Sequence, residues 1–121
     1  MNRLIEVRSY GLKPGASSEF HQLVTSTAIP LLRAWGMDVV AFGPSEHDPN
    51  AYFLVRAYDS LLHLQSQQQA FYSSQAWLQG PRDAIVSRIE SYLNTVLWLS
   101  EASIDDLRRS NSSAVDCVRD H

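Results

Sequence analysis

The sequence has little cysteine, little lysine and no long hydrophobic run. Its 121 residues include a single cysteine, Cys117, so a disulfide framework within one chain is excluded. No apolar segment approaches the ~20 residues of a membrane-spanning helix, and the charges of Arg3, Glu6 and Arg8 interrupt the first segment, so we expect no secretory signal. The one lysine, Lys13, lies in a Lys-Pro-Gly turn, which argues against a buried Schiff-base lysine.

The chain also lacks an excess of positive charge. Lysine and arginine number 10 and aspartate and glutamate 13, a formal net charge of -3 at pH 7. Nucleic-acid binding depends on neutralising phosphates, so we predict no nucleic-acid partner. Because no apolar run is long enough to span a bilayer, we also predict no membrane partner. With 45% hydrophobic residues the chain can bury the core of one domain. We therefore expect a one-domain cytoplasmic protein.

Strand-like and helix-like segments alternate along the chain. Pro30 lies inside the first helical segment and should kink or break it. The second helical segment has an inward stripe at Leu61, Leu64, Gln68 and Phe71. The pattern predicts strands at 4–10, 39–43, 51–58 and 89–99, and helical segments at 17–36 and 60–86.

This order, strand-helix-strand-strand-helix-strand, is typical of the ferredoxin-like α+β fold. We expect a four-stranded antiparallel sheet with helices on one face, formed by residues 1–100. Residues 101–121 are polar and aperiodic, which predicts a flexible tail in which Ser103 starts one helical turn. Cys117 lies in this tail and is interpreted as an idle exposed thiol.

Alternation along the strands sorts their side chains onto two faces. One set is aliphatic or small and consists of Ile5, Val7, Ser9, Ala51, Phe53, Val55, Ala57, Leu93, Leu97 and Leu99. The other set is aromatic and polar and consists of Glu6, Arg8, Tyr10, Tyr52, Arg56, Tyr58, Tyr92, Asn94 and Trp98. We expect the helices to cover the aliphatic face. The uncovered aromatic face then predicts a homodimer, in which two sheets enclose a cavity for a small organic molecule.

Several residues resemble a known family. These are the segment Glu6-x-Arg8-x-Tyr10-x-Leu12-Lys13-Pro14-Gly15, then Phe20, Pro30, Gly36, the region of Trp77, Arg82 and Ile89-Glu90. Over about residues 4–99 the chain resembles the NIPSNAP family. That family is similar to the dimeric α/β-barrel superfamily, which also contains cofactor-free oxygenases and muconolactone-isomerase-like enzymes. The resemblance implies a dimeric α/β barrel.

The arginines and tyrosines of the aromatic face are the main candidates for a ligand cavity. Arg8 and Arg56 could bind a carboxylate or enolate, or could form charge pairs with Glu6 and Glu90 at the dimer interface. Tyr10, Tyr58 and Tyr92 could donate to an oxyanion, or could simply pack with their hydroxyls bonded. Trp98 belongs to the same candidate set.

Three further candidates lie outside the strands. His21 is the one histidine of four that we keep as a catalytic candidate, with a surface or capping role as the alternative. Trp77 and Arg82 flank the Gly80-Pro81 break and could cover the mouth of the cavity, with packing as the alternative for Trp77. No histidine has metal-ligand spacing and no phosphate-binding loop occurs, so we predict no metal and no cofactor.

The leading hypothesis is a NIPSNAP-like homodimer of uncharacterised molecular function that binds a small aromatic or acidic molecule. One alternative is a cofactor-independent monooxygenase or isomerase, in which Arg8, Arg56 and a tyrosine polarise the substrate. The other is a non-catalytic protein-interaction module, whose aromatic face serves only dimerisation. The sequence leaves open whether the protein is an enzyme.

Overall fold

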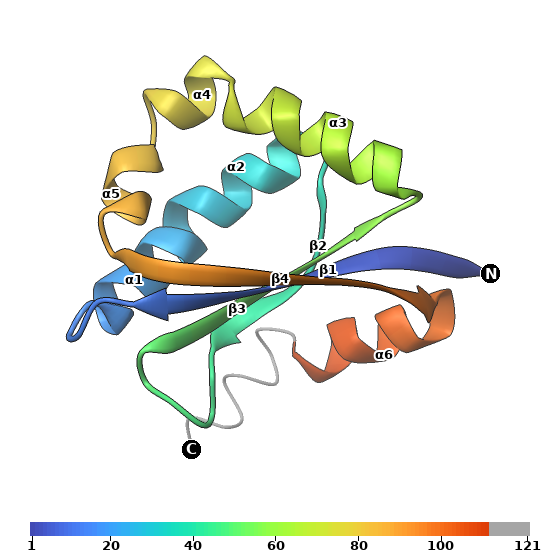
Figure 1. Ribbon diagram of the computed structural model, residues 1–121, viewed down its shortest axis with the longest axis horizontal. Helices are drawn as coiled ribbons and strands as arrows, with labels where there is room; N and C mark the ends of the chain where they lie inside the picture. The colour runs from blue at the N-terminus through green and yellow to red at the C-terminus, as the bar shows by residue number, and fades with distance from the viewer. Residues whose placement is uncertain (112–121) are drawn as a thin grey trace.

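The computed structural model describes residues 1–111, which form a four-stranded antiparallel sheet with helices packed on both of its faces (Figure 1). The elements in order are β1 (Asn2–Leu12), α1 (Ser17–Leu23), the π-helical segment η1 (Val24–Ala28), α2 (Ile29–Ala34), β2 (Asp38–Pro44), β3 (Ala51–Tyr58), α3 (Leu61–Tyr72), α4 (Gln75–Leu78), α5 (Arg82–Val86), β4 (Ile89–Ser100) and α6 (Glu101–Ser110). The strand order β2-β3-β1-β4 is that of a ferredoxin-like sheet, which confirms the predicted fold class.

Strand β1 lies between β3 and β4 and pairs antiparallel with both. The predicted strand 51–58 agrees with β3 at both ends, and the other three strands extend one or two residues beyond their predicted limits. Glu6 pairs with Arg56 of β3 on one side and with Val96 of β4 on the other. In these pairings, even-numbered residues of β1, β3 and β4 lie opposite one another and so share one face of the sheet, as the alternation predicts.

The first helical region is interrupted before Pro30, as predicted, although the interruption begins one turn earlier than the proline. Over η1 the backbone adopts π-helical bonding, in which the N–H of Ile29 donates to the carbonyl of Val24. Pro30 has no N–H for the carbonyl of Ser26, so regular α-helical bonding cannot run through this point. Helix α2 then begins with Pro30 in its first turn, where a missing N–H costs little.

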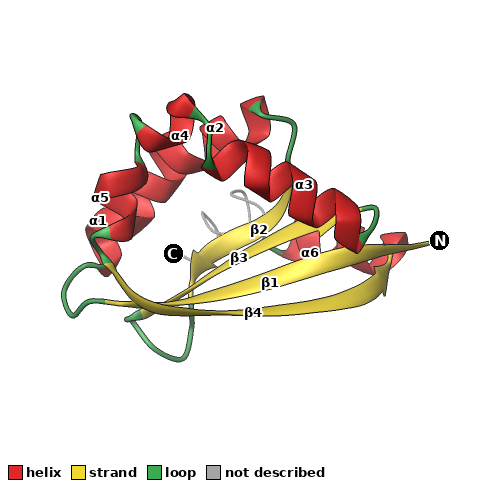
Figure 2. Ribbon diagram, turned by 45° about the horizontal axis from the view of Figure 1, so that its top comes forward, coloured by secondary structure: helices red, strands yellow, loops and turns green. Residues whose placement is uncertain are grey.

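Helices α1 to α5 cover the aromatic and polar face of the sheet (Figure 2). The expectation that they cover the aliphatic face is therefore wrong. The core beneath these helices contains Tyr52 and Leu54 of β3 together with Phe20, Phe71 and Trp77 from the helices. The Phe20 and Tyr52 rings meet edge to face at 5.0 Å, so large helix side chains pack directly on the tyrosine rings. The predicted inward stripe of the second helical segment is wrong at its first residue, because Leu61 of α3 is exposed.

The aliphatic face is covered in part by α6. Ile104 of this helix is buried against Ile5, Val40 and Val55. The side chain of Ser100 caps the helix by accepting from the N–H of Ser103, so the helix begins earlier than expected and is longer than one turn. Residues 101–110 are thus part of the folded unit and not of a flexible tail. Cys117 lies outside the described residues.

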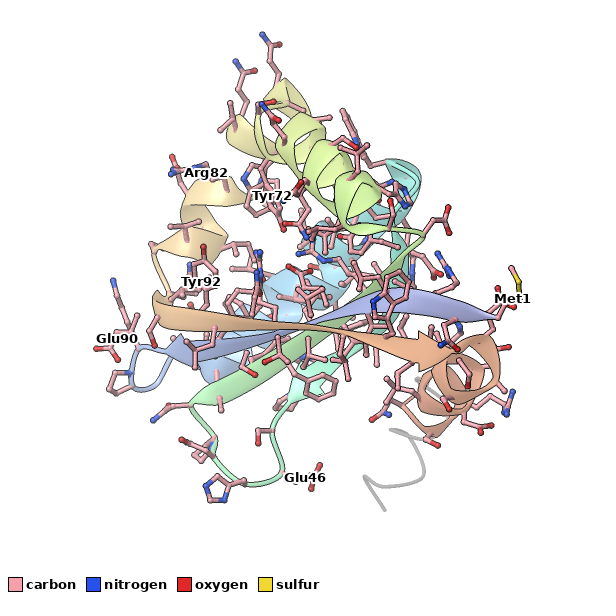
Figure 3. The ribbon with its side chains drawn as sticks, turned by 45° about the vertical axis from the view of Figure 1, so that its right-hand side comes forward. Met1, Glu46, Tyr72, Arg82, Glu90 and Tyr92 are labelled. Carbon is pink, nitrogen blue, oxygen red and sulfur yellow. The ribbon has the colours of Figure 1, made fainter. Side chains whose placement is uncertain are left out.

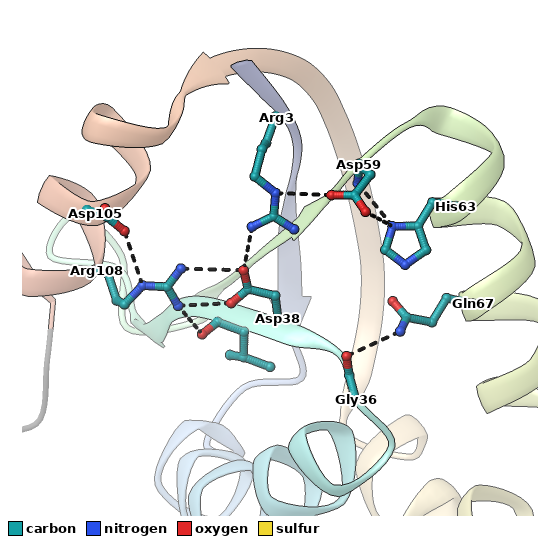
Figure 4. A network of polar contacts seen from close by, with 9 residues as sticks. Arg3, Gly36, Asp38, Asp59, His63, Gln67, Asp105 and Arg108 are labelled. Atoms are coloured by element: carbon teal, nitrogen blue, oxygen red, sulfur yellow. Dashed lines mark hydrogen bonds and ion pairs between the residues drawn. The ribbon is translucent and has the colours of Figure 1, made fainter. Parts of the chain in front are cut away.

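A carboxylate on β2 joins α6 to the sheet (Figure 4). Arg3 Nη1 donates to Asp38 Oδ2 at 2.7 Å, and Arg108 Nη1 donates to Asp38 Oδ1 at 2.9 Å. Burial raises the pKa of Asp38, but the hydrogen bonds from Arg108 and Arg3 outweigh it and lower the pKa overall. The hydrogen bond to Asp38 in turn raises the pKa of Arg3.

No helix within residues 1–111 is long and apolar enough to cross a membrane.

We predict that Asp38→Asn lowers the free energy of unfolding by about 1–2 kcal/mol near neutral pH. Because the folded-state pKa of Asp38 lies below its ordinary value of 3.8, its contribution is fully present above that pH and is lost as the pH falls through the folded-state pKa. In urea unfolding at several pH values, the free energy of unfolding should therefore fall less steeply at acid pH for the variant than for the wild type. The control is Asp106→Asn, which removes an exposed pair with Arg109 within α6 and should change little. Equal losses in the two variants would contradict the role of Asp38.

Candidate functional site

A buried polar cluster lies between the sheet and α3, and Glu6 is at its centre. Glu6 and Arg56 are both fully buried. Arg56 Nε donates to Glu6 Oε1 at 2.9 Å, and Arg56 Nη2 forms an ion pair with the same oxygen at 2.7 Å without hydrogen-bond geometry. Arg8 Nη2 donates to the other oxygen, Glu6 Oε2, at 3.1 Å. One carboxylate therefore pairs with two guanidinium groups.

Helix α3 completes the cluster with Gln68 and Tyr72. Gln68 Nε2 lies 3.0 Å from Glu6 Oε2 and 3.0 Å from Tyr58 Oη, and donates to both. Tyr72 Oη accepts from Arg56 Nη1 at 2.9 Å. Burial lowers the pKa of Arg56, but Tyr72 and Glu6 outweigh it and the pKa is raised overall. Arg56 is therefore charged at neutral pH.

The cluster borders a cleft of about 540 Å³ between β1, β4 and the helices α3 to α5. Arg8 forms its polar end, where the guanidinium carbon lies 4.9 Å from the centre of the Tyr92 ring and 5.9 Å from that of Tyr72. Both distances are within the range of cation–π attraction. Tyr72 and Tyr92 approach this space from α3 and β4, whereas Glu90 at the mouth points outward (Figure 3). Apolar and aromatic side chains form the opposite wall, namely Trp77, Ile85, Val86 and Ile89.

Two tyrosines of this region, Tyr10 and Tyr58, have raised pKa values. Burial, followed by the proximity of Tyr72, raises the pKa of Tyr10 to about 12. Burial also raises the pKa of Tyr58. Burial lowers the pKa of Arg8, but Tyr10, Tyr72 and Glu6 outweigh it, so that the pKa is raised overall. The cleft thus presents phenol donors and a cation.

The structure brings four of the nine predicted site residues to the cleft, namely Arg8, Tyr10, Trp77 and Tyr92. Arg56 and Tyr58 lie behind the cleft and are joined to it by hydrogen bonds. Arg56 donates to Glu6 and Tyr72, and Tyr58 accepts from Gln68. The two arginines do form charge pairs, but both pair with Glu6 within one chain, whereas the expected alternative placed such pairs with Glu6 and Glu90 at a dimer interface.

The other three candidates lie elsewhere. His21 Nδ1 is 2.6 Å from Tyr52 Oη, away from the residues that line the cleft. Arg82 points outward and pairs with Asp83 at 2.9 Å (Figure 3). Trp98 pairs with Leu4 on the edge strand and is exposed. Within residues 1–111, no group of three or more His, Cys, Asp or Glu side chains could hold a metal.

Sequence reasoning missed Gln68 and Tyr72 as site residues. Gln68 was placed only on the inward stripe of its helix, and Tyr72 was not considered. A signal was present, because Leu64, Gln68 and Tyr72 are spaced four residues apart and so lie one turn above another on one helix face. Polar residues that continue an apolar stripe in this way indicate a buried polar contact.

The fold is shared with known NIPSNAP structures. No protein-family profile matches the sequence, and no curated protein is similar to it. A NIPSNAP family protein of unknown function from Agrobacterium tumefaciens superposes with a TM-score of 0.74 and 23% identity, over 81% of this chain and 88% of that one. An uncharacterized NIPSNAP domain protein from Burkholderia xenovorans has a TM-score of 0.70 and 20% identity, over 78% and 91%. The resemblance expected from the sequence is confirmed at the level of the fold.

A second group of similar structures carries a different description. A putative antibiotic biosynthesis monooxygenase from Bordetella bronchiseptica has a TM-score of 0.60 and 22% identity, over 84% of this chain and 98% of that one. A putative antibiotic biosynthesis monooxygenase from Nitrosomonas europaea has a TM-score of 0.61 and 16% identity, over 78% and 88%. Identities this low establish a common fold, and function must be argued from the site.

We predict that Glu6→Gln destabilises the protein far more than Arg8→Gln. The Glu6 change leaves two guanidinium groups in the buried cluster without a carboxylate, which should cost about 3–5 kcal/mol in the free energy of unfolding. The Arg8 change leaves the Glu6–Arg56 pair balanced and should cost about 1–2 kcal/mol. Urea unfolding of both variants measures the difference, and an equal loss in the two would contradict the shared-carboxylate arrangement.

Proposed function

We propose that the protein is a NIPSNAP-like binding protein whose cleft between sheet and helices holds a small organic molecule. The observation that carries this proposal is the cleft of about 540 Å³, with a charged, donor-rich end beside Arg8 and an apolar wall that includes Trp77. Small-molecule sites usually have volumes of roughly 300–1,000 Å³ and combine an apolar lining with a few polar groups. The NIPSNAP structures of unknown function support the family through their fold, and they do not identify the ligand.

The proposed ligand cavity lies within one chain, whereas the sequence predicts a cavity between the two sheets of a homodimer. Part of the aromatic face that was expected to meet a second copy lies beneath α1 to α5, whereas Tyr92 and Trp98 on β4 are exposed. Arg8, Tyr72 and Trp77, which line this cleft, all belong to one chain, which supports a site that needs no second copy.

We propose in addition that the protein is a homodimer formed through the aliphatic face of the sheet. Helix α6 covers one end of this face, while Leu93 and Leu97 of β4 are exposed at the edge beside it. Strand β4 is a 12-residue edge strand. It carries neither lysine nor proline, the residues that commonly prevent edge-to-edge pairing. A second copy related by a two-fold axis would cover both the leucines and the edge.

Cofactor-independent monooxygenase or isomerase chemistry is a second candidate function. It is favoured by the convergence of Arg8, Tyr10 and Tyr72 on one cleft, because these groups would stabilise an oxyanion that develops on a substrate. The raised pKa of Tyr10 suits a hydrogen-bond donor and disfavours its use as a base at neutral pH. Binding is therefore the first proposal and turnover the second.

A blocked cleft should lose its ligands. We predict that a thermal-shift screen of small organic acids, amides and alcohols finds compounds that raise the Tm of the wild-type protein. Val86→Trp places an indole in the cleft and should abolish these shifts. The matched control is Leu78→Trp, because Leu78 is 45% exposed and Val86 42%, but Leu78 does not line the cleft. A wild-type protein that responds to no compound, or a Val86→Trp variant that keeps the wild-type shifts, would contradict the proposal.

The homodimer can be tested with two leucines of nearly equal exposure. Leu93 is 76% exposed on the aliphatic face, and Leu62 is 74% exposed on α3. Light scattering should give a dimer mass for the wild type and for Leu62→Asp, and a monomer mass for Leu93→Asp, because a buried unpaired carboxylate is costly. A monomeric wild-type protein, or a dimeric Leu93→Asp variant, would refute this interface.

A further inference from the structure

The hydroxyl of Tyr72 has a proton that no group of the described chain accepts. Its oxygen already accepts a hydrogen bond from Arg56 Nη1 at 2.9 Å. A phenol has one proton to donate besides its acceptor sites. Within residues 1–111, no acceptor for this proton is found, and Tyr72 lines the cleft. The cleft therefore offers a donor whose partner has to come from a ligand or from water.

The charge beside this donor is positive. Glu6 contributes one negative charge, while Arg8 and Arg56 contribute two positive charges, which leaves the buried cluster with a net charge of about +1. Of the three charged members, Arg8 is the one that lines the cleft. Glu90 is exposed and points outward from the mouth, so water and salt screen its charge (Figure 3). A single negative charge in the cleft would make the cluster neutral.

The opposite wall determines the shape of the ligand. Trp77, Ile85 and Val86 are apolar, and the Tyr92 ring faces the same space from β4. The side chain of Ile85 is buried, and Trp77 is fixed by edge-to-face contact with Tyr72 at 5.3 Å between ring centres. A flat apolar or aromatic body fits between these surfaces, since aromatic rings pack well by stacking and edge contact.

We propose that the cleft selects flat organic monoanions over their neutral isosteres. The carboxylate or enolate oxygen of the ligand accepts from the Tyr72 hydroxyl and pairs with the Arg8 guanidinium, while the planar body packs against Trp77, Ile85 and Val86. This inference rests on the proposed function of the same cleft and adds the charge, number of charges and orientation of the ligand. Tyr72 and Arg8 act here as specificity-determining residues.

Calorimetric titration with three related probes tests the selection. The probes are naphthoate, naphthamide of the same substitution, and a naphthalenedicarboxylate, titrated into the wild-type protein near neutral pH. Charge-assisted hydrogen bonds to Arg8 and Tyr72 should make naphthoate bind about tenfold tighter than naphthamide. The dicarboxylate should bind no tighter than naphthoate, because its second charge has no partner in the cleft.

Three variants assign the selection to its residues. Arg8→Gln should reduce the affinity ratio of naphthoate to naphthamide to about one, and Tyr72→Phe should reduce it severalfold while keeping the packed ring. Arg82→Gln is the control and should keep the wild-type ratio, because Arg82 pairs with Asp83 outside the cleft. If Arg8→Gln does not fold, Tyr72→Phe decides the question.

The outcomes separate this inference from the proposed function. Equal affinity for acid and amide in the wild type, or an unchanged ratio in Tyr72→Phe and Arg8→Gln, overturns charge selection while leaving a small-molecule cleft. Binding of uncharged compounds alone in the thermal screen also overturns charge selection. Failure of all three naphthalene probes and of every screened compound to bind overturns the proposed function together with the inference.

Discussion

The arrangement of this protein depends on one carboxylate, Glu6 of the central strand. Its two oxygens receive Arg56 on one side and Arg8 on the other. With its charge in place, the polar face of the sheet can be buried beneath helices, because the arginine nearest the core has a partner and needs no water. Gln68 and Tyr72 attach α3 to the same cluster. The cleft exists because these contacts hold α3 above the sheet near Arg8.

A buried ion pair is an expensive way to fill a core, since apolar residues of similar volume commonly give equal or greater stability. Its presence here is explained by the positive charge that the cluster leaves unneutralised. Glu6 neutralises one of the two arginines, and the second positive charge remains at the wall of the cleft. The two sides of the sheet then have separate tasks. The polar side holds the candidate ligand site, and the aliphatic side carries α6 and the surface proposed for a second copy.

Much of the fold, and part of the site, could be predicted from the sequence. Alternation correctly grouped Glu6, Arg8 and Arg56 on one face, because strand geometry alone fixes which side chains share a face. It could not tell which face the helices cover, since that depends on whether the polar groups find partners within the chain. The usual preference of helices for an aliphatic sheet surface gave the wrong answer here. The spacing of Leu64, Gln68 and Tyr72 indicates a buried polar contact on one face of α3, but it does not identify the partner of Tyr72, which is Arg56, 16 residues away in sequence.

The central claim is that an organic anion binds between the sheet and the helices of one chain, with its charge beside Arg8. The most direct measurement is the anomalous diffraction signal of bromine from crystals containing bromobenzoate. The account predicts a bromine peak next to Trp77, Ile85 and Val86, with the carboxylate density beside Arg8 and Tyr72. A peak between the aliphatic faces of two sheets, or a carboxylate directed away from Arg8, would contradict it.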